Sequence, residues 1–454
     1  MELDSMTTRK EDINQFITSQ LQELAQKKRL SREMWSSLEQ TFQKKSEGTF
    51  LWISFMAQDL QKQRLLDFEA SLEMLPAGLD AVYDRILQNI DFEKQEMIRG
   101  ILYWVLVAKS PLTIPQLCEA VDIEPQGFLT RENVCIELIK CCGHLLQIKD
   151  KHNRSYTKQT VTFLHQSAKD YLMASERRQI TGLALPQLHE HATIILIRYL
   201  ESISSHPGIE SRRWRDIMKD FPMADYAIQN WHRHFDTLED ITQVMQQGAR
   251  FFEEDSKARL TWQNLYGFDD DDEDYSPIPL LHLSAKLLLN RLTEWCLRSD
   301  RELDLEAEWG VFQHTALVYA CENQQEYIIT LLLDAGANAV AAHYSHTNAL
   351  EAALSYCNRH ILHILAQSES CRNFLIEKGS KEDGSLINVA AESANEDACR
   401  FLIEDLGWDL NWQNGRVGQL ASWPCLLPWK MATSILSAVL SKSGMFPLGI
   451  TQTN

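Results

Sequence analysis

The sequence predicts a mainly α-helical protein whose C-terminal part is a solenoid of helix-pair repeats. Apolar residues recur every three or four positions along most of the 454-residue chain, as on the buried face of a helix. Only residues 143–165 show the alternation that is typical of a β-hairpin. Four similar apolar segments then follow one another at intervals of 36, 33 and 37 residues, which indicates a repeat architecture.

Residues 1–94 are predicted to be a helical region. The segment 12–26 places its apolar residues on one face, with Asp12 as the expected N-cap, and the segment 32–46 repeats the pattern. Gly48 then precedes the dense apolar run "TFLWISFMAQDL". A run of this kind usually lies inside a large domain, so we expect it to be buried.

Residues 95–175 are predicted to form a winged-helix-like domain. Helical spacing continues beyond residue 95, is interrupted at Pro111, and returns in a third helix at 131–143. Two short segments, 143–149 and 159–165, carry β-branched and alternating residues on either side of a polar loop. Three helices followed by a hairpin are the element order of a winged helix.

Residues 176–268 are again helical in pattern and are interpreted as a spacer. They lead into residues 269–279, where six consecutive acidic residues precede Pro277 and Pro279. Because like charges in a row repel one another, this segment is predicted to be a solvated, flexible linker. Calcium binding by the acidic run is disfavoured, since the run lacks the glycine of an EF-hand loop.

Residues 280–411 are predicted to hold about four ankyrin repeats. The recurring segments are "LLHLSA", "ALVYAC", "ALEAAL" and "LINVAA", and their period is close to that of this repeat. In the second repeat Thr315 is expected to start the first helix, and Gly336 to end the second helix in a left-handed conformation. Residues 412–454 lack this register and are interpreted as a divergent or disordered tail.

Five short motifs carry a resemblance to a known family. They are "GTFLW" at 48–52, "LPAGLDAVYDRIL" at 75–87, "PLTIPQLCEA" at 111–120, "HQSAKDYL" at 165–172 and "YAIQNWHRH" at 226–234. In this order the chain resembles the fungal NACHT-type signal-transduction ATPases with numerous domains (STAND proteins) that end in ankyrin repeats. The resemblance runs from about residue 12 through the repeats.

The resemblance implies that residues 1–94 are the helical C-terminal remnant of a NACHT module and that the winged helix is an internal regulatory piece. The family's phosphate-binding loop is not found. The nearest string, "GSKEDGSL" at 379–386, lacks the Lys-Ser/Thr that must follow the second glycine. We therefore expect no complete ATP site and no cofactor, and we interpret the chain as the downstream part of such a protein.

Charge and cysteine content narrow the function classes. The chain carries 44 basic and 63 acidic residues, a net charge of −19. A field of that sign repels nucleic acid and anionic membranes, so neither is expected as a partner. The ten cysteines form no C-x-x-C pair, and no leader or membrane-spanning segment is found. Reduced thiols and a cytoplasmic location are expected, with the nucleus as an alternative.

Several residue groups suggest catalytic or metal chemistry, and for each a structural interpretation is preferred. "HEHAT" at 189–193 lacks the second histidine of a zinc-binding helix, and the histidines of 231–235 and 360–363 fit helix faces. The His, Ser and Asp of "HQSAKD", 165–170, cannot form a catalytic triad by closeness in sequence alone. No metal site, small-molecule substrate or enzyme activity is expected.

Non-catalytic protein binding through the ankyrin repeats, as a scaffold or regulator, is the preferred function. The alternative is that the chain is the C-terminal sensor of a nucleotide-dependent STAND switch. Nucleic-acid binding by the winged helix is less favoured, because its third helix balances Arg131 and Lys140 with two glutamates.

The partner contact is predicted at the hairpin tip between the second and third repeats, residues 341–347. This tip presents His343, Tyr344 and His346 together. Aromatic side chains with polar ends are enriched at the energetic centres of interfaces. The alternative that Tyr344 folds back on its own repeat stays open.

Overall fold

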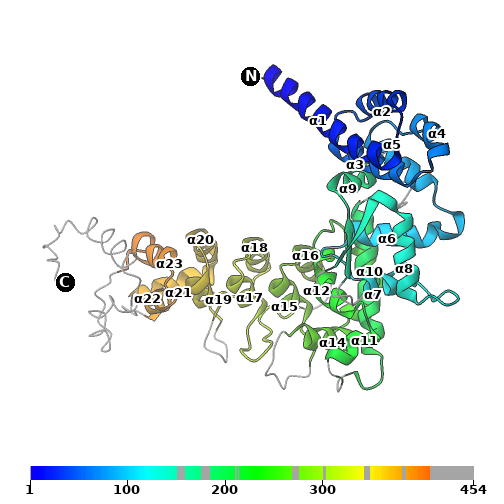
Figure 1. Ribbon diagram of the computed structural model, residues 1–454. Coiled ribbons are helices and arrows are strands. Elements are labelled where there is room, and N and C mark those ends of the chain that lie inside the picture. Colours follow the sequence, from blue (N-terminus) through cyan, green and yellow to red (C-terminus); the bar gives the residue numbers. More distant parts are fainter. Residues whose placement is uncertain are drawn as a thin grey trace, which may run out of the picture. The chain divides into compact units, whose positions relative to one another are not determined.

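The computed structural model describes residues 2–150, 159–174, 185–209, 212, 214–267, 276–299, 303–341, 348–380 and 385–408. Two compact units divide the chain, Met1–Leu188 and His189–Asn454. Both consist mainly of α-helices, and the two-stranded sheet found among the described residues lies in the first unit (Figure 1). The predicted mainly α class is therefore confirmed.

The N-terminal part of the first unit is helical. Its longer elements are α1 (Glu2–Lys28), α2 (Arg32–Lys45), α3 (Phe50–Lys62), α4 (Phe68–Glu73) and α5 (Gly78–Gln88). The apolar run after Gly48 forms α3 and is buried as expected: Trp52 is fully enclosed, and its indole Nε1 donates to the Pro76 carbonyl at 3.0 Å. The prediction of Asp12 as an N-cap is wrong, because α1 already begins at Glu2 and no glycine or proline interrupts it.

The winged helix follows in the same unit. Its elements are α6 (Gln95–Val107), α7 (Ile114–Ala120), α8 (Arg131–Cys141), β1 (Leu146–Asp150), β2 (Gln159–Phe163) and α9 (Gln166–Met173). β1 and β2 are antiparallel, with Ile148 opposite Val161. The Val161 N–H also donates to the Leu112 carbonyl at 2.9 Å, beside a bridge between Thr113 and Thr160. The predicted three helices and hairpin are confirmed. The bridge to residues 112 and 113 also holds the start of α7 against β2.

The second unit begins with helices that surround an aromatic core. They are α10 (Leu185–Ser204), α11 (Trp214–Asp220), α12 (Ala224–Phe235), α13 (Thr242–Gln247) and α14 (Lys257–Tyr266). Trp231 lies at the centre, with ring centroids 5.0 Å from Phe251 and 5.4 Å from Trp262 in edge-to-face arrangements. Such aromatic pairs add to the free energy gained from burial alone.

A buried arginine fixes the chain that leads out of this core. Arg259 is 1% exposed, and its guanidinium donates to the carbonyls of Phe251 (2.6 Å), Glu254 (2.8 Å) and Ile278 (2.8 Å). The Ile278 N–H in turn donates to Gln263 Oε1 at 2.8 Å. The end of the predicted acidic linker is therefore packed against α14, whereas its six acidic residues lie outside the described ranges.

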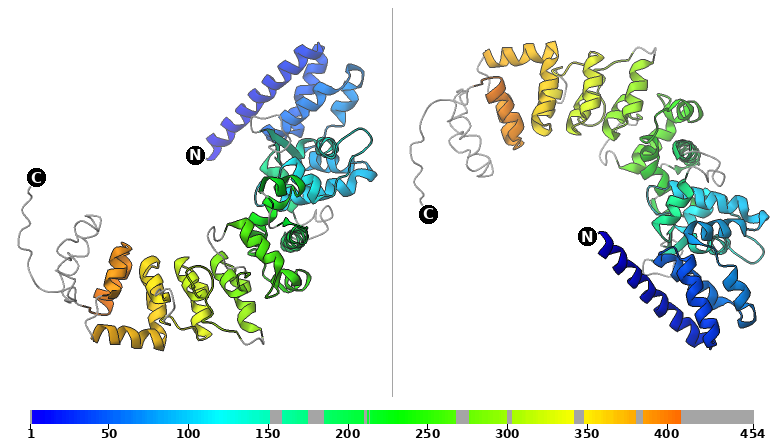
Figure 2. Two further views of the ribbon diagram at one scale, coloured as in Figure 1. Left: turned by 90° about the horizontal axis from the view of Figure 1, so that it is seen from below. Right: turned by 90° about the horizontal axis from the view of Figure 1, so that it is seen from above.

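Four helix pairs make up the rest of the second unit. They are α15 (Leu280–Leu287) with α16 (Asn290–Arg298), α17 (Ala316–Glu322) with α18 (Glu326–Asp334), α19 (Ala349–Tyr356) with α20 (Arg359–Gln367), and α22 (Ser385–Glu392) with α23 (Glu396–Arg400). The first helices of the pairs pack against one another in one row, and the second helices form another (Figures 1 and 2). A further helix, α21 (Glu369–Ser380), precedes α22, and a π-helical turn, η8 (Phe401–Asp405), continues α23.

The register of these pairs follows the sequence pattern. Leu317 and Leu350, from two of the recurring segments, are buried in α17 and α19. The Thr315 hydroxyl accepts from the Val318 N–H at 3.3 Å and caps α17, and Gly336, with a φ of +100°, follows α18 as predicted. The finer assignment to ankyrin repeats in a solenoid, and the division of the chain into a NACHT remnant, spacer, linker and tail, stay predictions.

Within the described ranges, no helix combines the length and the apolar content that crossing a bilayer would require.

Candidate functional site

The hairpin tips beside the first helices were predicted to hold the partner contact. His343, Tyr344 and His346 lie outside the described residues, so their placement stays a prediction. The preceding tip is described, however. The N-caps Thr315 and Asn348 lie 33 positions apart at the starts of α17 and α19. The same shift pairs the predicted tip with residues 308–314.

Residues 309–314 form a closed hairpin. Backbone hydrogen bonds of 3.1 Å run in both directions between Trp309 and His314, and the Gln313 N–H donates to the Gly310 carbonyl at 2.9 Å. Gly310 has a φ of +83°, and a Cβ at this position would lie 3.0 Å from the Tyr319 hydroxyl. Glycine is therefore required both by the backbone conformation and by the close approach of Tyr319.

The apex of this hairpin is apolar and exposed. Val311 is 51% exposed and Phe312 65% exposed, although a tip in water is normally small and polar. Within the described part of the chain, the ring that Phe312 contacts is the nearby imidazole of His314, at a centroid distance of 5.7 Å. Two adjacent apolar side chains are thus presented to solvent on a short, hydrogen-bonded loop.

The base of the hairpin is buried and fixed. Trp309 is 5% exposed, and its carbonyl accepts from the Tyr319 hydroxyl at 3.3 Å. The Lys286 ammonium lies 5.5 Å from the Trp309 ring centroid and 5.0 Å from that of Tyr319, within the range of cation–π attraction. His282, whose Nε2 lies 2.9 Å from the Ala307 carbonyl, is so buried that its pKa falls to about 4.

The described chain connects this tip to the next one. The Glu306 carboxylate accepts from the Asn338 N–H at 2.7 Å, at the start of the segment that leads to residues 341–347. The Leu350 N–H donates to the Ala339 carbonyl at 2.9 Å and fixes the same segment to α19. These two hydrogen bonds therefore fix residues 338 and 339, just before the predicted tip, to both Glu306 and α19.

The second helices of the pairs, by contrast, are joined to one another by hydrogen bonds and ion pairs between their polar side chains. The Tyr327 hydroxyl of α18 donates to the Glu294 carboxylate of α16 at 2.8 Å, which is the main cause of the lowered pKa of Glu294. Glu326 of α18 lies 3.3 Å from the imidazole of His360 of α20. Each of these contacts joins one pair to the next.

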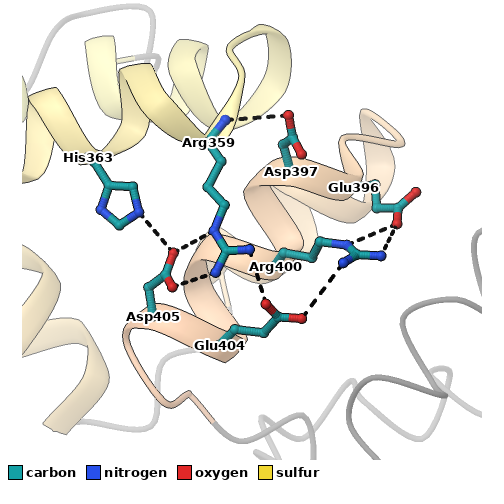
Figure 3. A network of polar contacts seen from close by, with 7 residues as sticks. All are labelled: Arg359, His363, Glu396, Asp397, Arg400, Glu404 and Asp405. Atoms are coloured by element: carbon teal, nitrogen blue, oxygen red, sulfur yellow. Dashed lines mark hydrogen bonds and ion pairs between the residues drawn. The ribbon is translucent and has the colours of Figure 1, made fainter.

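A network of ion pairs joins the third helix pair to the fourth, between α20 and the helix formed by α23 and η8 (Figure 3). We call this contact the Arg359 joint. Arg359 of α20 donates through Nε to Asp405 at 2.7 Å and through Nη1 to Glu404 at 3.0 Å. The His363 imidazole lies 3.0 Å from the same Asp405 carboxylate. The hydrogen bonds from Arg359 are the main cause of the lowered pKa of Asp405. These charges are paired within the protein, so this side is better explained by stability than by recognition.

His189 and His234, from the predicted 189–193 and 231–235 groups, make hydrogen-bond contacts within the protein. His234 is fully buried, with Nδ1 2.9 Å from His189 Nδ1 and Nε2 2.9 Å from the Tyr226 hydroxyl. Among the residues that the structure describes, no three His, Cys, Asp or Glu side chains are grouped closely enough to hold a metal ion. The contact between half-buried His189 and buried His234 was not foreseen, because the two residues are 45 positions apart in the sequence.

The motif at 165–170 caps a helix. His165 Nδ1 accepts from the Ser167 N–H at 3.1 Å and so caps the start of α9, while the Ser167 hydroxyl lies 2.9 Å from that of Tyr83. The Asp170 carboxylate accepts from the Gln166 side chain at 2.8 Å. The structure brings His165 and Ser167 together, but Asp170 has a different partner.

The third helix of the winged helix presents no unpaired cation. Arg131 of α8 pairs with Glu119 at 3.1 Å, and Lys140 pairs with Glu137 at 2.7 Å. Contacts of these two side chains to phosphates would compete with both pairs. That nucleic acid is not a partner stays a prediction.

Comparison with known protein families identifies the winged helix. The family described as "GPI inositol-deacylase, winged helix domain" matches residues 83–182. This segment is a winged-helix domain, in agreement with its helices and hairpin. The family match does not extend to residues 280–411.

Two curated fungal proteins are distant relatives. Vegetative incompatibility protein HET-E-1 of Podospora anserina is 28% identical over 184 residues, which are 39% of this chain and 13% of that protein. Azaphilone pigments biosynthesis cluster protein L of Monascus ruber is 27% identical over 293 residues, 59% of this chain and 61% of that protein. The matches thus span less than two thirds of either relative, and no solved structure matches the chain.

Proposed function

We propose that this protein is a non-catalytic regulatory chain that binds a protein partner through the hairpin tips of its helix pairs, taken as ankyrin repeats. The observation that carries this proposal is the pair of exposed apolar side chains, Val311 and Phe312, on a hairpin whose base is buried. Stacked repeats of this type present their tips as one extended binding surface.

The energetics of such a tip favour binding. Burial of one phenylalanine side chain contributes about 1.5–3 kcal/mol. A flexible loop would lose part of this gain as conformational entropy on binding, whereas the closed hairpin 309–314 is ordered beforehand. Phe312 therefore has the features of a preformed anchor, and Tyr344, 33 positions after Val311, is the candidate on the next tip.

The winged helix supports a second part of the proposal. Its family match and the distant similarity to HET-E-1 fit the alternative that the chain is the sensor part of a nucleotide-dependent STAND switch. In that arrangement residues 1–94 are the end of a NACHT module, and the nucleotide-binding half is on a longer product or a separate chain. The helix pairs then receive the signal, and the winged helix passes it on.

Recovery of the partner with the tagged full-length protein tests the first part. The recovered protein is identified, purified and titrated against wild type, a Val311→Ser/Phe312→Ser double variant and Tyr344→Ala. Ile376→Ser is the matched control, because Ile376 of α21 is 63% exposed in the same unit. The double variant should lose most of its affinity and the control none; equal affinity of all four proteins would contradict the proposal.

Calorimetry with ATP and Mg²⁺ tests the second part. We expect no binding to this chain alone, since the string nearest to a phosphate-binding loop, at 379–386, lacks the required lysine. Micromolar binding that also raises the melting temperature would show that the nucleotide site lies in this chain after all.

A further inference from the structure

Phe128 lies at the apex of the turn between α7 and α8 of the winged helix. It is more exposed than in an extended peptide, at 108%, and its neighbour Leu129 is 45% exposed. Single exposed apolar residues are common on protein surfaces and need no special explanation. Phe128 differs from such residues in that its turn is rigid and acidic residues flank it in the sequence.

The turn that carries Phe128 is held at its centre and at both ends. The Gln126 N–H donates to the Leu129 carbonyl at 3.2 Å, and the Leu129 N–H donates back to Gln126 at 2.9 Å. Gly127, with a φ of +58°, takes the first central position of this two-residue turn, where a left-handed backbone favours glycine. Buried Ile123 anchors one end, and the Thr130 hydroxyl, which caps α8, anchors the other.

The charges around the turn are acidic. Asp122, Glu124 and Glu132 flank it, and the structure pairs none of them with a cation among the residues it describes. Arg131, the cation next to the turn in the sequence, is engaged by Glu119 at 3.1 Å. The exposed apolar apex therefore lies in a segment with three acidic residues for which the described part of the chain shows no cationic partner.

We propose that the Phe128 turn is a second docking site, separate from the helix-pair tips, for a folded protein with an apolar pocket rimmed by lysine or arginine. The convex shape of the apex requires a concave acceptor, and its carboxylates require positive charge around that acceptor. The same carboxylates repel phosphates, which disfavours nucleic acid and anionic lipid as occupants. A second copy of this chain, at −19, fits poorly for the same reason.

The test uses the full-length protein with two substitutions at the apex and one control. A protein retained by wild type and not by Phe128→Asp is purified, and its Kd is measured against wild type, Phe128→Ala and Leu66→Ala. Leu66 is 96% exposed in the same unit and serves as the control. Phe128→Ala should weaken binding by about tenfold or more at an unchanged melting temperature, and the control should stay within about twofold of wild type.

The charge requirement is tested separately. An Asp122→Lys/Glu124→Lys variant should bind more weakly, and the difference from wild type should shrink as salt is raised from about 0.05 M to 0.5 M. Equal affinity of wild type and Phe128→Ala, or the absence of any protein that Phe128→Asp fails to retain, would overturn the proposal.

Other occupants and the first proposal are distinguished by two further arms. Binding of phosphatidylserine vesicles or of duplex DNA that depends on Phe128 would replace the protein partner with a membrane or a nucleic acid. Phe312→Ser should leave the Phe128-dependent complex intact. Loss of that complex with Phe312→Ser and not with Phe128→Ala would leave the helix-pair tips as the binding site and refute this one.

Discussion

The winged helix and the helix pairs stabilise themselves in different ways. In the winged helix, the Leu112 carbonyl accepts from the N–H of Val161, 49 positions later, so one core is closed by contacts between distant segments. In the helix pairs, each first helix packs against its own partner and against the next first helix. The difference teaches that damage to the winged helix should spread through a whole domain, whereas damage to one pair should reach only its neighbours.

The largest effects should come from matched core substitutions in the two regions. Leu117 of α7 and Leu350 of α19 are both fully buried, and truncation of either to alanine should cost about 2–5 kcal/mol. Hydrogen exchange separates the two cases. Leu117→Ala should expose amides throughout α6, α7, α8 and β2, and Leu350→Ala should expose those of α17, α19 and α22 while α15 stays protected. If Leu350→Ala increased amide exchange equally in all four first helices, the expected difference between the two regions would be wrong.

The joint at Arg359 should have the next largest effect. Arg359→Met removes the cation that holds α20 to the Glu404 and Asp405 carboxylates, and hydrogen bonds to charged groups contribute about 1.5–3 kcal/mol. Chemical denaturation measures the loss, with Arg372→Met as the control. Among the described residues, the Arg372 side chain donates to a nearby backbone carbonyl and pairs with no carboxylate. A loss no larger than that of the control would show that the network is dispensable.

The same variant should alter the response to acid. Arg359 is the main cause of the lowered pKa of Asp405, so the stability that this carboxylate contributes is present above its unfolded pKa of about 4. It is lost as the pH falls through the lower folded value. The gap in unfolding free energy between wild type and Arg359→Met should therefore narrow below about pH 4.

A second pH effect should arise at the base of the exposed hairpin. His282 has a pKa of about 4 when folded, because burial disfavours its charged form, and about 6.5 when unfolded. Between these values the unfolded chain binds more protons, so stability falls as the pH falls. His282→Gln should reduce this slope by about 1 kcal/mol per pH unit. An unchanged slope in urea titrations at several pH values would show that His282 stays neutral in both states.

The same contrast explains what could be predicted from the sequence. The helices and the hairpin of the winged helix were predicted because apolar periodicity and β-branched residues are local signals. The helix pairs were predicted because Leu281, Leu317, Leu350 and Ile387 recur at similar intervals, and the structure buries all four. The approach of Leu112 to Val161 and the His189–His234 contact could not be predicted, since both depend on how distant segments pack.

The exposed hairpin at 309–314 was missed for a different reason. The sequence argument favoured 341–347 for its aromatic and histidine side chains, and the 33-residue shift between Thr315 and Asn348 would have drawn attention to the preceding tip. Exposure of Val311 and Phe312 could not be inferred from residue type, because apolar side chains are usually buried.

The smallest expected change in stability belongs to the variant that tests the central claim. Phe312 is 65% exposed, so Phe312→Ser should shift the unfolding free energy by no more than about 0.5 kcal/mol. This separates it from the core and joint variants, which act through folding. Its effect on the partner complex can therefore be read as an effect on binding.

The most direct measurement is the Kd of the purified partner for wild type, Phe312→Ser and Ile376→Ser by titration calorimetry. Protein binding through the helix-pair tips predicts that Phe312→Ser weakens the complex by about 1–3 kcal/mol, about 5- to 150-fold. The control should match wild type, and all three proteins should melt at the same temperature. The same Kd for Phe312→Ser and wild type would contradict the account.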